Sequence, residues 1–353
     1  MGRAVRHLTG LKQRLRHLSH RFLFIGTLLL KGRLSWRKLH NYFASARAYR
    51  NLSELSGEAP AVVLFDVSNR CNLHCMTCRR SPTDIVDLSG QTEESVKLGD
   101  LALDRYKCII DDLHLDLLLA TLYVSGEPLL NREIVAMVAH SSRRGVASML
   151  STNGMLLNES LSTGLLDAGL DYLKVAVSGF TQDVYGVYHQ GGDVVKVLEN
   201  VANFERIRRQ LGKRCLVVID YILFEHNRHQ EGNVRRFCRE NGISFSLRHG
   251  RTLAGSELKS PAESRAHYQP KTGPCDWLWK IMVFCHDGRA VPCCQFATCA
   301  DSPLVMGIGG ETSAAKIWNG DKYRELRRVH ALKGRKGLPL CDDCFYSGID
   351  FQS

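Results

Sequence analysis

The sequence predicts an α/β fold built on a parallel sheet, with a helical extension at one end and a cysteine-rich module at the other. Short apolar segments alternate with amphipathic ones through the middle of the 353-residue chain, and the composition changes at both ends. This alternation favours parallel strands, because each parallel connection needs a crossover that is usually a helix. We expect four segments: 1–58, a basic amphipathic helical extension; 59–250, the α/β core; 251–273, a polar linker; and 274–353, the cysteine-rich module.

The N-terminal extension is basic and amphipathic. Its first 50 residues carry 12 Lys or Arg and no acidic side chain, while the rest of the chain has 35 basic and 36 acidic residues. Apolar residues recur every three or four positions and predict one helical stripe: Leu8, Leu11, Leu15, Leu18, Phe22, Ile25 and Leu29. Contact of residues 1–50 with an anionic membrane surface, packing on the core or on a partner subunit, and a transit peptide all fit this pattern. Because the basicity is local and no RNA-binding module accompanies it, we expect no nucleic-acid partner.

Cysteine usage indicates the compartment. Among 13 cysteines, three lie within eight residues of one another, which fits metal ligation in a reducing compartment better than disulfides. No apolar run approaches the roughly 18 residues that span a bilayer. We therefore expect a cytoplasmic protein, with residues 1–50 as its point of contact if it binds the cytoplasmic face of a membrane.

The elements of the core follow from apolar periodicity. The expected strands are residues 62–67, 121–124, 147–150, 173–177, 216–223 and 244–247, and the clearest helices are residues 103–113, 194–209 and 233–240. In parallel α/β folds the chemistry lies at the carboxyl ends of the strands, so we expect the loops that follow these strands to form the site.

A cysteine triplet follows the first expected strand. Cys71, Cys75 and Cys78 have C-x3-C-x2-C spacing on one loop. Three thiolates can bind three irons of a cubane cluster and leave the fourth iron without a protein ligand. A structural zinc site would need a fourth ligand, and His74 inside the loop is poorly phased to supply it.

This triplet resembles the cluster-binding loop of the radical S-adenosylmethionine (SAM) superfamily, although Thr77 stands where the family usually has an aromatic residue. The resemblance implies a partial (β/α)6 barrel over residues 59–250 and a [4Fe–4S] cluster whose open iron binds SAM. It implies reductive cleavage of SAM to methionine and a 5′-deoxyadenosyl radical, which abstracts a substrate hydrogen. It also implies a flavodoxin- or ferredoxin-type reductant.

Further motifs follow in the order that the family shows. Ser125, Gly126 and Glu127 begin a segment that resembles the family's GGEP motif, which would hold the ammonium group of SAM. Asn153 lies in a segment that resembles the TNG turn. Ser178 ends a segment that resembles the VSIDG strand and would lie near the SAM ribose or carboxylate, although the family's Asp is missing. Alone, each segment could be an ordinary turn at a strand end. Residues 188–192 (YHQGG) and Asn227 also resemble family segments.

The C-terminal module has a second cysteine pattern. Cys275, Cys293, Cys341 and Cys344 resemble the opening of the SPASM signature, but Asp350 stands where that signature would continue with another cysteine. The four cysteines therefore resemble the shorter twitch arrangement and imply one auxiliary [4Fe–4S] cluster. Zinc is the rival, although a zinc ribbon usually has two C-x2-C pairs and here there is one. Cys294 could replace its neighbour as the ligand.

A fully ligated auxiliary cluster suits electron transfer. The resemblance therefore implies an oxidoreductase that oxidises a small molecule, such as a sugar, a cyclitol or a lipid- or nucleotide-linked carbohydrate. Arg248 and His249 are candidate catalytic or substrate contacts, with loop solvation as the alternative. Cys299 is a candidate hydrogen-atom donor, with a core thiol as the alternative. A carbohydrate epimerase, a peptide maturase and a non-catalytic iron–sulfur electron-transfer protein remain open.

Overall fold

The structure is a computed structural model that describes residues 22–78, 97–252, 257–262, 269–297, 304–338, 340–342 and 344–345. Within these residues one nine-stranded sheet has the order β6-β5-β4-β3-β2-β1-β7-β8-β9. The six strands of the core are β1 (Val62–Phe65), β2 (Leu119–Thr121), β3 (Ala147–Thr152), β4 (Tyr172–Val177), β5 (Leu216–Leu223) and β6 (Ser244–His249). They pair in parallel, which confirms the predicted fold class.

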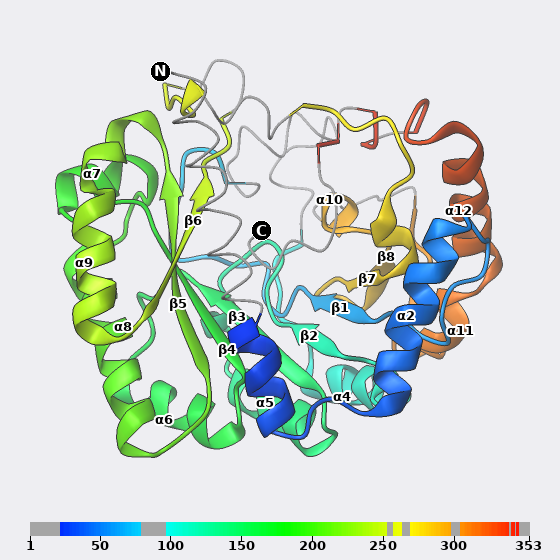
Figure 1. The fold of residues 1–353 in the computed structure, drawn as a ribbon, viewed down its shortest axis with the longest axis horizontal. Coiled ribbons are helices and arrows are strands. Elements are labelled where there is room, and N and C mark those ends of the chain that lie inside the picture. Colours follow the sequence, from blue (N-terminus) through cyan, green and yellow to red (C-terminus); the bar gives the residue numbers. More distant parts are fainter. Residues whose placement is uncertain are drawn as a thin grey trace.

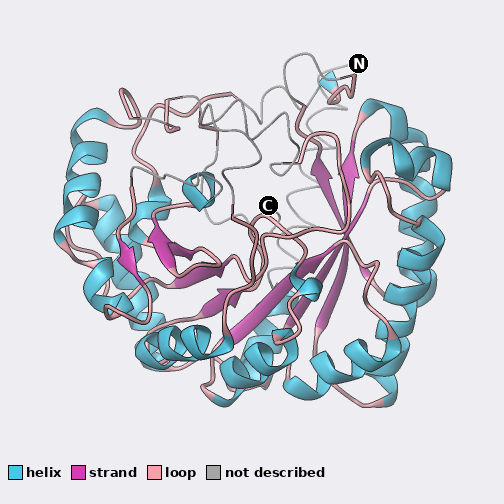
Figure 2. Ribbon diagram, turned by 180° about the vertical axis from the view of Figure 1, so that it is seen from behind, coloured by secondary structure: helices cyan, strands magenta, loops and turns pink. Residues whose placement is uncertain are grey.

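Helices cover the outer face of this curved sheet (Figures 1 and 2). The core helices are α4 (Leu103–Leu113), α5 (Ile134–Arg143), α6 (Glu159–Ala168), α7 (Gln182–Tyr188), α8 (Val194–Gln210) and α9 (Glu231–Asn241), with short η2 (Pro128–Leu130) and η3 (Glu225–Gln230). Local signals set their ends. In α6, for example, the side chain of Asn158 accepts from the backbone of Leu161, and Gly169 ends the helix with a φ of 93°.

Strand alternation separates an outer and an inner face. On β4, Leu173, Val175 and Val177 pack into the large cluster beneath the helices, whereas Tyr172 and Lys174 point to the inside of the barrel. The amino-terminal halves of the strands supply an apolar floor to this interior, formed with Val62, Leu119, Ala147, Met149, Tyr172, Val218 and Ile281. The polar inner residues lie above that floor.

A helix over residues 22–30 closes the floor from below. Phe24 and Leu28, one turn apart, are buried against the apolar floor residues. Phe22, Ile25 and Leu29, which belong to the predicted stripe, lie on another side of the helix and are 69%, 46% and 62% exposed. The helix therefore has two apolar sides, of which the sequence pattern singled out the exposed one. The earlier part of the stripe, residues 8–18, lies outside the described residues.

Basic side chains after this helix bind the barrel. Lys31 Nζ and Arg33 Nε lie 2.7 and 3.1 Å from the carboxylate of Asp171, which is fully buried at the start of β4. Lys38 donates to the carbonyl of Gly145. Part of the basicity of residues 1–50 is therefore used inside the molecule, and no helix in the described part of the chain is long and apolar enough to cross a membrane.

The ion pairs of Lys31 and Arg33 with Asp171 act as a clamp between the N-terminal region and the barrel, and they give a stability prediction. Asp171→Asn should lower the free energy of unfolding by about 3–5 kcal/mol, because it leaves buried cations without their counter-charge. Arg37→Gln is the matched control. It breaks the pair with Asp116, in which the Arg37 side chain is 59% exposed, and it should cost far less stability, because solvent screens an exposed ion pair. Urea unfolding of both apo-proteins measures the difference, and equal losses would contradict the clamp.

The C-terminal module extends the same sheet. β7 (Ile281–Phe284) pairs in parallel with β1, and β8 (Arg289–Val291) and β9 (Gly307–Ile308) continue antiparallel. η5 (Asp276–Trp279), α10 (Cys294–Ala297), α11 (Ala314–Trp318) and α12 (Asp321–Lys333) complete it, and α2 (Trp36–Arg50) packs beside η5. Because β7 of this module pairs with β1 of the core, the two segments share one sheet. The predicted domain boundary at residue 274 therefore stays a prediction.

Arg327 fixes this module to the segment that enters β1. Its buried guanidinium donates to the carbonyls of Leu278, Trp318 and Glu54. Burial lowers the pKa of Arg327 to about 10, so the side chain stays charged at neutral pH. The Trp279 indole donates to the carbonyl of Ser53, which adds a second tie.

Candidate active site

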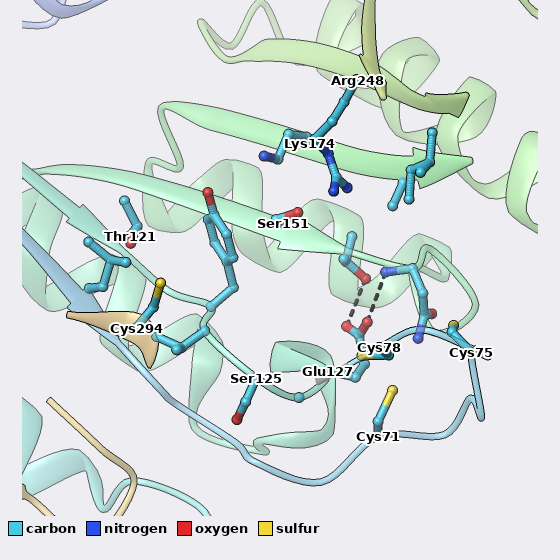
Figure 3. Close-up of a pocket in the computed structure, with 18 of the residues that line it drawn as sticks. Cys71, Cys75, Cys78, Thr121, Ser125, Glu127, Ser151, Lys174, Arg248 and Cys294 are labelled. Atoms are coloured by element: carbon cyan, nitrogen blue, oxygen red, sulfur yellow. Dashed lines mark hydrogen bonds between the residues drawn. The ribbon is translucent and has the colours of Figure 1, made fainter. Parts of the chain in front are cut away.

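A cavity of about 330 Å³ opens among the carboxyl ends of the core strands. Its wall includes the cysteine triplet, the loops after β2 and β3, the inner face of the strands, and Trp277, Ile281 and Cys294 of the C-terminal module. Figure 3 shows the triplet on one side of this space and Cys294 on the other. Its volume falls within the range of small-molecule sites.

Backbone hydrogen bonds hold the cysteine loop in this wall. The amide of Glu127 donates to the carbonyl of Arg70 at 2.7 Å, and the amide of His74 donates to the carbonyl of Gln190 at 3.0 Å. The Asn153 side chain donates to that of Asn72 at 2.8 Å. The loops after three different strands therefore fix the triplet.

Gly126 is required where the loops after β1 and β2 cross. A Cβ at this position would lie within 3.0 Å of the carbonyl oxygens of Ser68 and Arg70 and of the carbonyl carbon of Asn69. Ser125 is tied to the same segment, because its amide and its hydroxyl donate to the carboxylate of Asp66. The segment that begins at Ser125 therefore holds the cluster loop in place and also lines the cavity.

The donor set suits a cluster better than one ion. In the described part of the chain, no group of three or more His, Cys, Asp or Glu side chains is placed to hold a single metal ion. Ligands of a cubane bind different irons, so they stand further apart than those of one ion. Burial, with the charges of Cys78 and Cys71, raises the pKa of Cys75. Thiolates so placed need a cationic partner, which the irons of a cluster would be.

Glu127 binds its own scaffold. The carboxylate is 2% exposed and accepts from the Thr152 hydroxyl at 2.7 Å and from the amides of Asn153 and Leu129 at 2.8 and 3.0 Å. Burial raises its pKa to about 7, against the opposing effect of these hydrogen bonds. This side chain therefore joins the turn after β3 to the loop after β2, and Asn153 borders the cavity beside it.

Ser178 lies behind the cavity wall. It is fully buried and shares a 2.6 Å hydrogen bond with His189, which does line the cavity. Burial, with the charge of Arg248, lowers the pKa of His189 to about 3, so the imidazole is neutral. Asn227 joins the ends of β4 and β5 by donating to the carbonyls of Ser178 and Ile222.

Of the two candidate residues at the end of β6, one lines the cavity and the other does not. Arg248 lines the cavity, and its Nε donates to buried Asp220 at 2.9 Å. His249 is not among the described residues that line the cavity, as expected for the next position on a strand. A guanidinium stays protonated in proteins, so Arg248 suits a substrate contact and not a base.

The auxiliary cysteines lie within electrostatic reach of one another. Burial raises the pKa of Cys275 to about 12 and that of Cys341 to about 11, and the charge of Cys344 contributes to both. Burial, with the charges of Cys294 and Cys275, also raises the pKa of Cys293. Cys294, unlike Cys293, lines the cavity. Cys299 lies outside the described residues.

Two side chains of the cavity were not predicted from the sequence. Lys174 begins the strand segment that contains Ser178, and Tyr188 begins the YHQGG segment, but the sequence assigned neither side chain a role. In the structure both line the cavity, and Tyr188 packs against Phe224 beside the triplet. The alternation of β4 could have placed Lys174 inside the barrel, because it shares the face of Ala176. The family resemblance of residues 188–192 marks Tyr188 in the sequence, but only the fold brings its side chain to the cysteine loop.

Comparisons with known proteins agree with this geometry. The family model described as "Radical SAM superfamily" matches residues 65–231, and the model of SPASM, an iron–sulfur cluster-binding domain, matches residues 275–345. The chain belongs to the radical SAM superfamily. This radical SAM enzyme uses SAM and a [4Fe–4S] cluster, and its SPASM domain binds auxiliary iron–sulfur.

Its relatives act on different substrates. The enzyme is 27% identical to the AdoMet-dependent heme synthase of Methanosarcina barkeri, over 81% of this chain and 91% of that protein. It is 29% identical to the PqqA peptide cyclase of Rhizobium meliloti, over 83% and 81%. A match to the Fe-coproporphyrin III synthase of M. barkeri, at 27% identity, covers 31% of that protein.

Among solved structures, Streptococcus suis SuiB superposes with a TM-score of 0.61 at 14% identity, covering 80% of this chain and 70% of that one. This likeness shows the fold alone.

Proposed function

We propose that this enzyme oxidises a small molecule, with the SPASM domain accepting an electron from the substrate. The supporting observation is that Trp277, Ile281 and Cys294 of the SPASM domain line the same cavity as Cys71 and its two partners. A substrate in this cavity would contact both parts of the enzyme. When bound, the cofactors supply a radical that removes a hydrogen atom and an acceptor for the electron left behind.

Different residues of the chain would bind the clusters, SAM and the substrate. Cys71, Cys75 and Cys78 would hold the SAM-binding cluster, and Cys275, Cys293, Cys341 and Cys344 one auxiliary cluster. Ser125, Gly126 and Asn153 would contact SAM, with Glu127 and Ser178 positioning the turns around it. Arg248 would bind substrate. The proposed substrate is a sugar, a cyclitol or a carbohydrate linked to a lipid or a nucleotide, and a peptide is the alternative. A flavodoxin or a ferredoxin would be the reductant.

The test is product analysis by mass spectrometry. Anaerobically reconstituted enzyme, SAM and dithionite are incubated with a panel of sugars, cyclitols and sugar nucleotides. The expected result is 5′-deoxyadenosine formed in equal amount to a product that has lost two hydrogens. Failure to form 5′-deoxyadenosine with any reductant would overturn catalysis and favour an electron-transfer protein.

The position of Cys294 favours an epimerase as the second candidate. A thiol in the cavity wall could return a hydrogen atom to the opposite face of a substrate radical. In D2O the product would then carry one deuterium and would not be oxidised. The Cys294→Ala variant should lose epimerisation but contain as much iron as the wild type. A loss of iron would instead assign Cys294 to the auxiliary cluster as a ligand. Cys285→Ala is the control, because Cys285 is fully buried outside the cavity lining.

We also propose that the N-terminal region contacts an anionic membrane. The exposed apolar residues Phe22, Ile25 and Leu29 follow a segment with six Lys or Arg among residues 1–21, and each basic residue near such a surface contributes about 1 kcal/mol. Replacing all three apolar residues with serine should reduce co-sedimentation with phosphatidylserine vesicles. Undiminished binding of the triple variant would overturn this contact.

A further inference from the structure

The interior of the barrel is layered along its axis. The floor is apolar, and Phe24 and Leu28 close it. The rim carries the cysteine loop and the turns around Glu127 and Asn153. Between them lies a layer of polar side chains on the inner faces of β2, β3, β4 and β6 and on the loop after β2. This layer, named here the middle layer, consists of Thr121, Tyr123, Ser151, Lys174 and Arg248. The SAM motifs of the rim do not account for it.

Two cations lie in the middle layer. Lys174 is 2% exposed, and its amine stands 5.2 Å from the centroid of the Tyr123 ring. Figure 3 shows Lys174 of β4 and Arg248 of β6, two strands separated by β5, reaching toward the same part of the cavity, near Ser151. Burial of an ammonium group and a guanidinium is costly unless charge and hydrogen bonds compensate.

The charges around the cavity do not balance. Among its described lining residues, Lys174, Arg248 and Arg251 are cationic and Glu127 is the one acidic side chain. The carboxylate of Glu127 already accepts three hydrogen bonds at the rim. Asp220, which shares the inner face of β5 with Val218 and Ile222, pairs through Oδ2 with Arg248 Nε and fixes the guanidinium. Lys174 and Arg248 together, set against the one carboxylate of Asp220, leave an excess of one positive charge in the middle layer.

We propose that the substrate carries an anionic group, a carboxylate or a phosphate, which binds between Lys174 and Arg248. This inference rests on the proposed function, because it names the substrate class for the same cavity. Lysine supplies a compact point charge, and arginine a planar donor that matches both anions. The hydroxyls of Ser151 and Thr121 lie in the same layer and can donate to the remaining oxygens. An anion held there would direct the rest of the substrate toward the rim, where SAM binds.

The test uses inorganic phosphate and acetate as separate probes. Binding of each to the SAM-loaded holoenzyme is measured by calorimetry. Lys174→Met should weaken binding of the preferred anion roughly tenfold or more, because it removes a charge-assisted hydrogen bond. Lys174→Arg should restore most of it. Lys196→Met, which removes an exposed lysine of α8, should bind the anion as the wild type does. The probe that binds more tightly shows whether the anionic group of the substrate is a phosphate or a carboxylate.

Two results would overturn the proposal. One is a holoenzyme that binds neither probe, or that binds it equally well after Lys174→Met. The other is competition between SAM and the anion, with Lys174→Met weakening SAM binding, which would assign the lysine to the cosubstrate. Melting temperatures of the variants show whether each one folds. Formation of 5′-deoxyadenosine by the wild type tests the proposed function independently, so the two failures are distinguishable.

Discussion

Replacing Cys71, Cys75 and Cys78 together with alanine should reduce reductive SAM cleavage to the level of buffer alone. Without these thiolates no cluster with an open iron can form on the loop, and SAM cannot receive an electron. Iron should fall by about four atoms per chain, the content of one cubane, while the auxiliary site keeps its share. The measurements are 5′-deoxyadenosine by liquid chromatography and iron per chain on anaerobically reconstituted protein.

Cys108→Ala is the control for this experiment, since Cys108 is an exposed thiol on α4. It should keep the full iron content and rate. Circular dichroism shows whether the triple variant is folded. A folded triple variant that still gains the cluster and cleaves SAM would refute the assignment of the triplet.

Gly126→Ala should lower cluster content and SAM cleavage at least tenfold, although the substitution touches no proposed iron ligand. The added methyl group would collide with the backbone of Ser68, Asn69 and Arg70. Backbone cannot yield as a flexible side chain can, so the loop that carries Cys71 must move. Iron content and SAM-dependent changes in the electron paramagnetic resonance spectrum of the reduced cluster measure the effect.

Gly232→Ala is the matched control, because no heavy atom lies within 4 Å of an added Cβ in α9. It should keep full activity and be more stable by up to about 1 kcal/mol, since alanine favours a helix over glycine. A Gly126→Ala enzyme with wild-type iron content would show that the close approach of the two loops is dispensable.

The sequence by itself determined the cofactor chemistry and the order of the core elements. Three thiolates on one loop are a local pattern, and their spacing is fixed before the chain folds. The periodicities of β5 and α4 are local in the same sense, and both elements have the predicted bounds (Leu216–Leu223 and Leu103–Leu113). Family motifs also located the turns after β2 and β3, because such turns are short and carry distinctive residues.

Only the tertiary structure decided which side chains share the cavity. Lys174 and Arg248 lie 74 positions apart in sequence, and they meet because their strands curve around one interior. The pairing of β7 with β1 joins residues more than 200 positions apart. No local sequence pattern therefore predicts that the SPASM domain continues the sheet. The side of the N-terminal helix that packs inward, with Phe24 and Leu28, was likewise decided by the shape of the barrel floor. Sequence periodicity describes one element at a time, whereas a site is formed by the inner faces of several.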